Sequence, residues 1–177
     1  ASFYENLTHQ IVFEDDAPSL LEDNQSEVPS SEPYKYAITL VLDISGSIDD
    51  PKLQKIKDLL ILENNLLDQI QARTDEHVIT VVTFNSVATT SAMFTDICQV
   101  ETYIATLVSG GSTNYDAAVT AATAVIEGYG SNPSLIDYKQ LVYFISDGLP
   151  NTLTSEDALD DWEEALNLNN FNAVMVD

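Results

Sequence analysis

The chain has 177 residues, and its 29 Asp and Glu outnumber its 6 Lys and Arg to give a formal net charge of −23. Such an acidic surface repels nucleic acid and anionic membranes, so we expect no nucleic-acid partner and no direct insertion into a membrane. The length suits one domain with a well-buried core, and no stretch of sequence has the apolar length of a membrane span. The single cysteine, Cys98, excludes an internal disulfide, and its apolar neighbours predict a buried, inert thiol.

Residues 1–34 differ in composition from the rest of the chain. They contain eight acidic residues, five serines and three prolines, but no Lys or Arg. A segment with this composition buries too little apolar surface to fold by itself. We therefore interpret 1–34 as an acidic linker or the end of a preceding module, within a larger multidomain chain.

A buried strand is predicted at 37–42, where an apolar run ends in Asp43. Ser45 and Ser47 follow at alternating positions, and Gly46 between them allows a tight turn that can point both hydroxyls toward the carboxylate. Oxygen ligands of this kind suit a small hard cation such as Mg²⁺, Mn²⁺ or Ca²⁺. The alternative for this motif alone is an ordinary Ser/Gly turn after a strand.

A helix is predicted to begin at Asp50, a residue type that caps helices, with proline at the next position. Apolar residues then recur near helical spacing as far as Ile70. The lysines between them are interpreted as a solvated face of this helix: Lys52, Lys55 and Lys57.

Strands and helices continue to alternate along the rest of the chain. Strands are expected at 78–84, 87–94, 141–145 and 171–176, and helices at 97–107, 117–125 and 156–168. Strands separated by helices indicate an α/β fold, namely a Rossmann-like, doubly wound, mainly parallel sheet with helices on both faces. We expect this domain to span 35–177.

Two further polar motifs lie where such a fold brings loops together. The sequence Gly-Gly-Ser-Thr-Asn at 110–114 opens a helix, and Ile-Ser-Asp-Gly at 145–148 closes a strand. Sites in parallel sheets form beyond the carboxyl ends of the strands, which is where Asp43 and Asp147 fall. The helix start at Thr113 can lie on the same edge.

The three motifs together resemble the von Willebrand factor type A family, whose metal-ion-dependent adhesion site combines D-x-S-x-S with a later threonine and a later aspartate. Thr113 lies 70 residues after Asp43 and Asp147 a further 34, about the family's spacing. The resemblance implies a divalent cation bound by five residues: Asp43, Ser45, Ser47, Thr113 and Asp147. Because domains of this family usually continue past the last predicted strand, we expect the chain to lack the last helix or strand of the fold.

The resemblance implies binding, not catalysis. In the family the serine hydroxyls bind the cation directly, aspartates often act through water, and the threonine can join when a ligand is engaged. Two formal negative charges leave the cation electrophilic, with an open position for a carboxylate of the partner. We therefore expect a metal-dependent adhesion or ligand-binding module that uses Mg²⁺ or Ca²⁺, with Mn²⁺ as a third candidate.

Two other classes of function remain as alternatives. A Mg²⁺-dependent phosphoryl-transfer enzyme would use Asp43 as a nucleophile or ligand, but the glycine-rich loops carry no Lys or Arg and no G-K-[ST] motif. A serine hydrolase is disfavoured because His9 and His77 lie away from the motif loops. A structural domain with a vestigial metal site would keep the fold without binding a cation.

The segment at 14–18, Glu-Asp-Asp-Ala-Pro, is similar to the junctions between tandem β-sandwich repeats in giant bacterial surface adhesins. A strongly acidic chain is also compatible with calcium-rich or salty surroundings, where cations screen its charge. We therefore expect a secreted or cell-surface setting, in a bacterial adhesin of the kind that supports biofilms.

Overall fold

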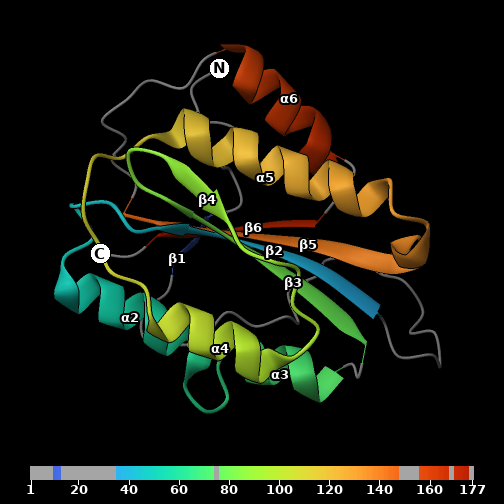
Figure 1. Ribbon diagram of the computed structural model, residues 1–177, viewed down its shortest axis with the longest axis horizontal. Coiled ribbons are helices and arrows are strands. Elements are labelled where there is room, and N and C mark those ends of the chain that lie inside the picture. Colours follow the sequence, from blue (N-terminus) through green and yellow to red (C-terminus); the bar gives the residue numbers. More distant parts are fainter. Residues whose placement is uncertain (1–9, 13–34, 74–75, 148–155, 168–169, 176–177) are drawn as a thin grey trace.

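The computed structural model describes residues 10–12, 35–73, 76–147, 156–167 and 170–175. These residues form a central sheet that lies between two layers of helices (Figure 1). The α/β fold class predicted from the alternation of strands and helices is therefore confirmed.

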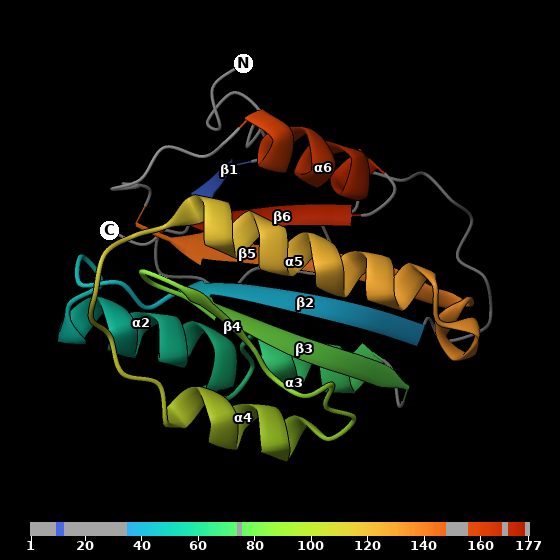
Figure 2. The ribbon, with the colours of Figure 1, turned by 45° about the horizontal axis from the view of Figure 1, so that its top comes forward.

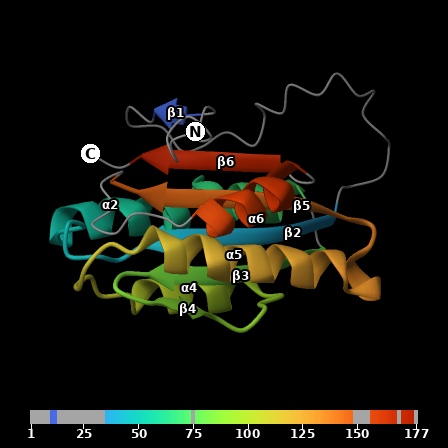
Figure 3. The same cartoon turned by 90° about the horizontal axis from the view of Figure 1, so that it is seen from above.

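Six strands make up the sheet: β1 (Gln10–Val12), β2 (Lys35–Asp43), β3 (His77–Phe84), β4 (Ala88–Thr90), β5 (Tyr138–Ser146) and β6 (Asn170–Met175). Their order across the sheet is β1-β6-β5-β2-β3-β4, which Figure 3 shows from above. All neighbouring strands are parallel except β3 and β4, which are antiparallel. The carboxyl ends of β2, β3 and β5 consequently lie on one edge.

The helices cover both faces of the sheet. One layer holds α2 (Asp50–Ile61), α3 (Leu66–Arg73) and α4 (Ile97–Ala105); the other holds α5 (Tyr115–Gly130) and α6 (Glu156–Asn167). A short 3-10 helix, η1 (Pro133–Leu135), precedes β5. Among the described residues, no helix has both the length and the apolar character needed to cross a bilayer.

The central strand β2 is buried on both of its faces. Leu40 and Leu42 pack with the layer of α2, α3 and α4, whereas Val41 between them packs with α5 and α6. Complete burial of each such side chain contributes about 1.5–3 kcal/mol. This packing fixes the path of β2 up to its last residue, Asp43, which is itself fully buried.

The single helix predicted from Asp50 to Ile70 is instead two helices, α2 and α3, separated by a turn. Asn64 in this turn has a φ of 67°, in the left-handed region that Asn tolerates better than most residues. Its backbone N–H donates to the Asp68 carboxylate at 2.8 Å. Because apolar residues on both sides of the turn face the same core, their spacing alone does not reveal the break.

Two smaller predictions near the β4 edge are also corrected. Of the strand expected at 87–94, only β4 pairs continuously, and Phe94 forms an isolated bridge with Ile79. Cys98, which was expected to be buried, is exposed. It follows Ile97 in the first turn of α4, and Ile97 is the residue of this pair that faces the core.

Part of the N-terminal segment belongs to the sheet. Gln10–Val12 form β1, which pairs in parallel with β6, so the interpretation of 1–34 as a linker or preceding module is wrong for these three residues. Ile11 and Val12 are β-branched and suit a strand, and their pairing satisfies main-chain groups along the edge of β6. The other residues of 1–34 lie outside the described part of the chain, so the boundary of the 35–177 domain remains a prediction there.

One buried polar contact ties α5 to the sheet and can be tested. The Tyr129 hydroxyl lies 2.6 Å from Thr80 Oγ1 and 3.1 Å from the Ile38 carbonyl oxygen, and it donates its single proton to one of them at a time. We expect Tyr129→Phe to lower the free energy of unfolding by about 1–2 kcal/mol, because Thr80 Oγ1 and the Ile38 carbonyl lose their buried hydroxyl partner. Urea unfolding measures this, with Tyr138→Phe as the control, since the Tyr138 hydroxyl makes only an exposed 3.4 Å contact with Glu76.

Tyr129→Phe should also differ from wild type in how its stability depends on pH. Burial raises the pKa of Tyr129 from 10.0 to about 12. The folded state thus keeps this proton after the unfolded chain has lost it, so stability is lost as pH rises from about 10 to about 12. Tyr129→Phe should therefore lose less stability than wild type as the pH rises through this range. An identical pH dependence of stability in wild type and Tyr129→Phe would contradict the assignment of this loss to Tyr129.

Candidate metal centre

Three loops meet at the carboxyl edge of the sheet, around the end of β2. Figure 2 shows the chain leaving β2 and the segment leading into α5 at this same edge. Main-chain hydrogen bonds hold them together: Gly46 N–H donates to Gly111 O and Gly110 N–H donates to Ile44 O, both at 2.8 Å. The sequence motifs at 43–47 and 110–114 are thus joined by their backbones.

Glycine is required at two of these positions. A Cβ at Gly46 would lie 3.0 Å from the carbonyl oxygen of Gly111, a backbone atom that cannot easily move. Gly111 has a φ of 86°, and a Cβ there would lie 2.9 Å from Ser86 Oγ. Because the two loops approach closely, the side chains that follow Gly46 and Gly111 lie near one another.

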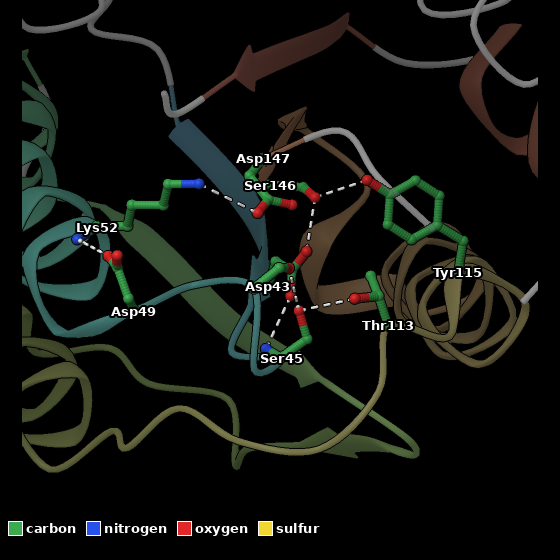
Figure 4. Close-up of polar contacts among 9 residues, drawn as sticks. Asp43, Ser45, Asp49, Lys52, Thr113, Tyr115, Ser146 and Asp147 are labelled. Atoms are coloured by element: carbon green, nitrogen blue, oxygen red, sulfur yellow. Dashed lines mark hydrogen bonds and ion pairs between the residues drawn. The ribbon is translucent and has the colours of Figure 1, made fainter. Parts of the chain in front are cut away.

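Asp43 lies at the centre of the polar cluster (Figure 4). Its Oδ1 accepts a hydrogen bond from Ser45 N–H at 2.8 Å, and its Oδ2 accepts one from Ser146 Oγ at 2.6 Å. Ser146 itself contacts Tyr115 Oη at 2.6 Å. Because the single Ser146 proton points to Asp43, Tyr115 is the donor in that second bond.

A chain of hydroxyl groups runs beside the carboxylate. Thr113 Oγ1 donates to Ser45 Oγ at 2.8 Å, and Ser45 Oγ lies 3.0 Å from Ser47 Oγ. Ser45 and Thr113 are fully buried, whereas Ser47 is exposed. The cluster therefore reaches the protein surface on the side of Ser47.

Asp147 completes the set of five predicted residues, at the end of β5. Its side chain is only 4% exposed, and its Oδ2 lies 3.4 Å from Lys52 Nζ on α2. Its other oxygen, Oδ1, is buried and has no hydrogen-bond partner among the described residues. A buried carboxylate oxygen without a partner is costly, and such an atom calls for an explanation.

The two aspartates affect one another electrostatically. Burial raises the pKa of Asp43 above its usual range, the hydrogen bonds from Ser146 and Ser45 oppose this, and the negative charge of Asp147 raises the pKa further. A nearby positive charge is what would favour the ionised form of Asp43.

All five residues predicted from the sequence are thus found at one edge of the sheet, but the sequence did not predict three of their neighbours. Ser146 and Tyr115 support Asp43, and Lys52 contacts Asp147 where a solvated lysine was expected. Ser146 could have been suspected, since it directly precedes Asp147 at a strand end. Tyr115 is held by ring contacts with Phe84 and Phe144, which only the fold reveals.

The donor atoms in this cluster are of a single chemical kind. Among the described residues there is no group of three or more His, Cys, Asp or Glu side chains suited to a metal, so a cation here would depend on hydroxyl oxygens as well as on two carboxylates. Oxygen donors alone fit a hard divalent cation and would not hold a soft one. The orphaned Asp147 Oδ1 and the buried Asp43 fit the same kind of ion.

Solved structures with a similar fold come from several settings. An aerotolerance-related membrane protein from Bacteroides fragilis has a TM-score of 0.59 at 16% identity, over 80% of this chain and 67% of that one. The vWF domain of the type V pili tip protein Mfa5 from Porphyromonas gingivalis has a TM-score of 0.50 at 15% identity, over 68% of this chain and 40% of that one. The SpRpn10 VWA domain has a TM-score of 0.55 at 12% identity, over 80% of this chain and 88% of that one. At such identities the likeness is one of fold.

Comparison by sequence is more specific. No curated protein matches the chain in a direct search. The family model of the von Willebrand factor type A domain, however, matches residues 37–176, which include every strand and helix described here except β1 and the first two residues of β2. The match also includes the three loops that meet at the end of β2. The chain therefore belongs to the von Willebrand factor type A domain family.

Proposed function

We propose that this domain binds a partner through a divalent cation held by five side chains: Asp43, Ser45, Ser47, Thr113 and Asp147. Domains of its family are commonly protein-interaction or adhesion modules. The observation that carries the proposal is the buried pair of carboxylates beside a chain of hydroxyls, with one Asp147 oxygen lacking any partner among the described residues.

Each residue has a distinct part in the proposed site. Asp43 and Asp147 supply the negative charge, and Ser45, Ser47 and Thr113 supply neutral oxygen donors. When bound, the cation would supply a Lewis-acidic point able to accept a carboxylate oxygen from a partner. Ser47 is the exposed member of the set, so the partner would approach from its side. The small number of carboxylates favours Mg²⁺, while Ca²⁺ or Mn²⁺ could bind the same oxygens.

An extracellular or cell-surface role in a bacterial adhesin is part of this proposal. Two of the similar structures are described as a membrane protein and as a pilus tip protein, which associates this fold with bacterial surfaces. The strong net negative charge also fits surroundings rich in divalent cations.

A phosphoryl-transfer enzyme is less well supported by the geometry. Asp43 is fully buried and accepts two hydrogen bonds, so its carboxylate is poorly exposed for attack on a phosphate ester. His77, the histidine among the described residues, begins β3 at the opposite end of that strand from the site, so no described histidine lies beside Ser45 or Ser47. Recognition therefore accounts for the site better than catalysis does.

The first test is cation binding by Asp43→Asn, with Asp49→Asn as a matched control. Both changes remove one negative charge, and Asn can replace Asp49 as the cap of α2. We expect calorimetric titration with Mg²⁺, Mn²⁺ and Ca²⁺ to detect binding by the wild type and the control but not by Asp43→Asn. Unchanged affinity in Asp43→Asn would contradict the proposed site.

The same variants should differ in stability without a cation. Burial raises the pKa of Asp43, so ionising this carboxyl group in the folded protein lowers the free energy of unfolding. Stability is therefore lost as pH rises through the folded-state pKa of Asp43. We therefore expect Asp43→Asn in EDTA at neutral pH to melt at a higher temperature than wild type. Saturating Mg²⁺ should raise the melting temperatures of the wild type and of Asp49→Asn but not that of Asp43→Asn.

The second test concerns the partner. An array of immobilised peptides presenting Glu or Asp, with matching Gln and Asn peptides, should retain the domain only through the acidic set and only with a divalent cation. We expect Thr113→Ala to weaken this retention about tenfold, equivalent to about 1.4 kcal/mol, while weakening cation binding less. Retention that persists in EDTA would refute a metal-bridged contact.

A further inference from the structure

Lys52 stands out among the few basic residues of this acidic chain. It lies in the first turn of α2, and its side chain is 30% exposed. Its ammonium Nζ lies 3.4 Å from Asp147 Oδ2, as Figure 4 shows. The Lys52 ammonium group thus contacts a carboxylate of the proposed cation site.

This contact differs from an ordinary surface ion pair. Lys35 and Glu76 approach to 2.9 Å at the other end of β2, but their side chains are 42% and 55% exposed. Asp147 is 4% exposed, and its other oxygen has no partner among the described residues. Water screens charges at the exposed pair, whereas little water reaches the Asp147 carboxylate, so its charge is less screened.

We propose that Lys52 is a tethered counter-ion that sets the cation affinity of the site. The inference rests on the proposed function, since it assumes that a divalent cation binds beside Asp147. Without the cation, the ammonium group neutralises part of the charge of Asp147, the residue whose negative charge acts on Asp43. When the cation binds, the ammonium group must move away from Asp147 or remain as an unfavourable like charge.

Two opposite effects follow from this arrangement. Lys52 stabilises the cation-free fold, because it limits the repulsion between Asp43 and Asp147. It also lowers the affinity for the cation, because the cation must replace or tolerate an existing positive charge. Lys52 would therefore keep the loops in place at low cation concentration while delaying occupancy until the concentration rises.

Lys55 provides a matched control on the same helix. It is partly buried like Lys52, and no hydrogen bond or ion pair of its side chain is found among the described residues. Lys52→Met and Lys55→Met change the net charge equally and insert a residue of similar helix propensity. Lys52→Arg keeps the positive charge and so separates the effect of charge from that of side-chain shape.

The experiment is calorimetric titration of wild type and the three variants with Mg²⁺ and with Ca²⁺, together with melting temperatures in EDTA and at saturating cation. We expect Lys52→Met to bind about tenfold more tightly than wild type and Lys55→Met, and to melt at the lowest temperature in EDTA. Lys52→Arg should stay close to wild type. The deficit of Lys52→Met in melting temperature should shrink when the cation is saturating.

The outcomes separate this inference from the function on which it rests. If wild type binds a cation but Lys52→Met binds it no more tightly than Lys55→Met, the role of Lys52 is refuted and the proposed site stands. If Lys52→Met binds a cation that wild type does not, the counter-ion role is supported. If no variant binds any of these cations, both proposals fail.

Discussion

The burial of a carboxylate at the end of the central strand is the constraint on which the site depends. Asp43 is fixed there by β2, which is packed on both faces, so it cannot turn toward water. The neighbouring loops must therefore supply its partners, namely the Ser45 N–H and the Ser146 hydroxyl. Glycines at 46 and 111 allow those loops to approach closely enough. The packing of the core therefore determines how the polar residues at this edge are arranged.

The aromatic residues beneath the site link the packing of the core to the polar cluster around Asp43. Phe84 and Phe144 hold the Tyr115 ring at centroid distances of 5.6 and 5.5 Å, and Trp162 of α6 packs on Phe144 at 6.3 Å. Tyr115 in turn orients the Ser146 hydroxyl toward Asp43. A side chain on α6 can therefore influence the cluster through this series of ring contacts.

Local patterns in the sequence predicted most of the fold, and the resemblance to the von Willebrand factor type A family predicted the five clustered residues. The β-branched run at 78–84 corresponds to β3, and the apolar run before Asp147 corresponds to β5, because buried parallel strands need continuous apolar sequence. The break at Asn64 and the strand at Gln10–Val12 were missed, since one depends on a single backbone conformation and the other on pairing with a distant segment. The roles of Lys52 and Tyr115 were missed for the same reason: they arise from contacts across the fold.

The parallel pairing of β1 with β6 has a mechanical consequence. The register joins Gln10 to Ala173 and Val12 to Met175, so the first residue of β1 and the last residue of β6 lie at opposite ends of one strand pair. Tension applied at these two residues acts along the strands in opposite directions. Such shear strains all the hydrogen bonds of the pair together, whereas a peeling force would break them one at a time. A domain loaded in this way resists extension along its chain better than it resists being pried open sideways.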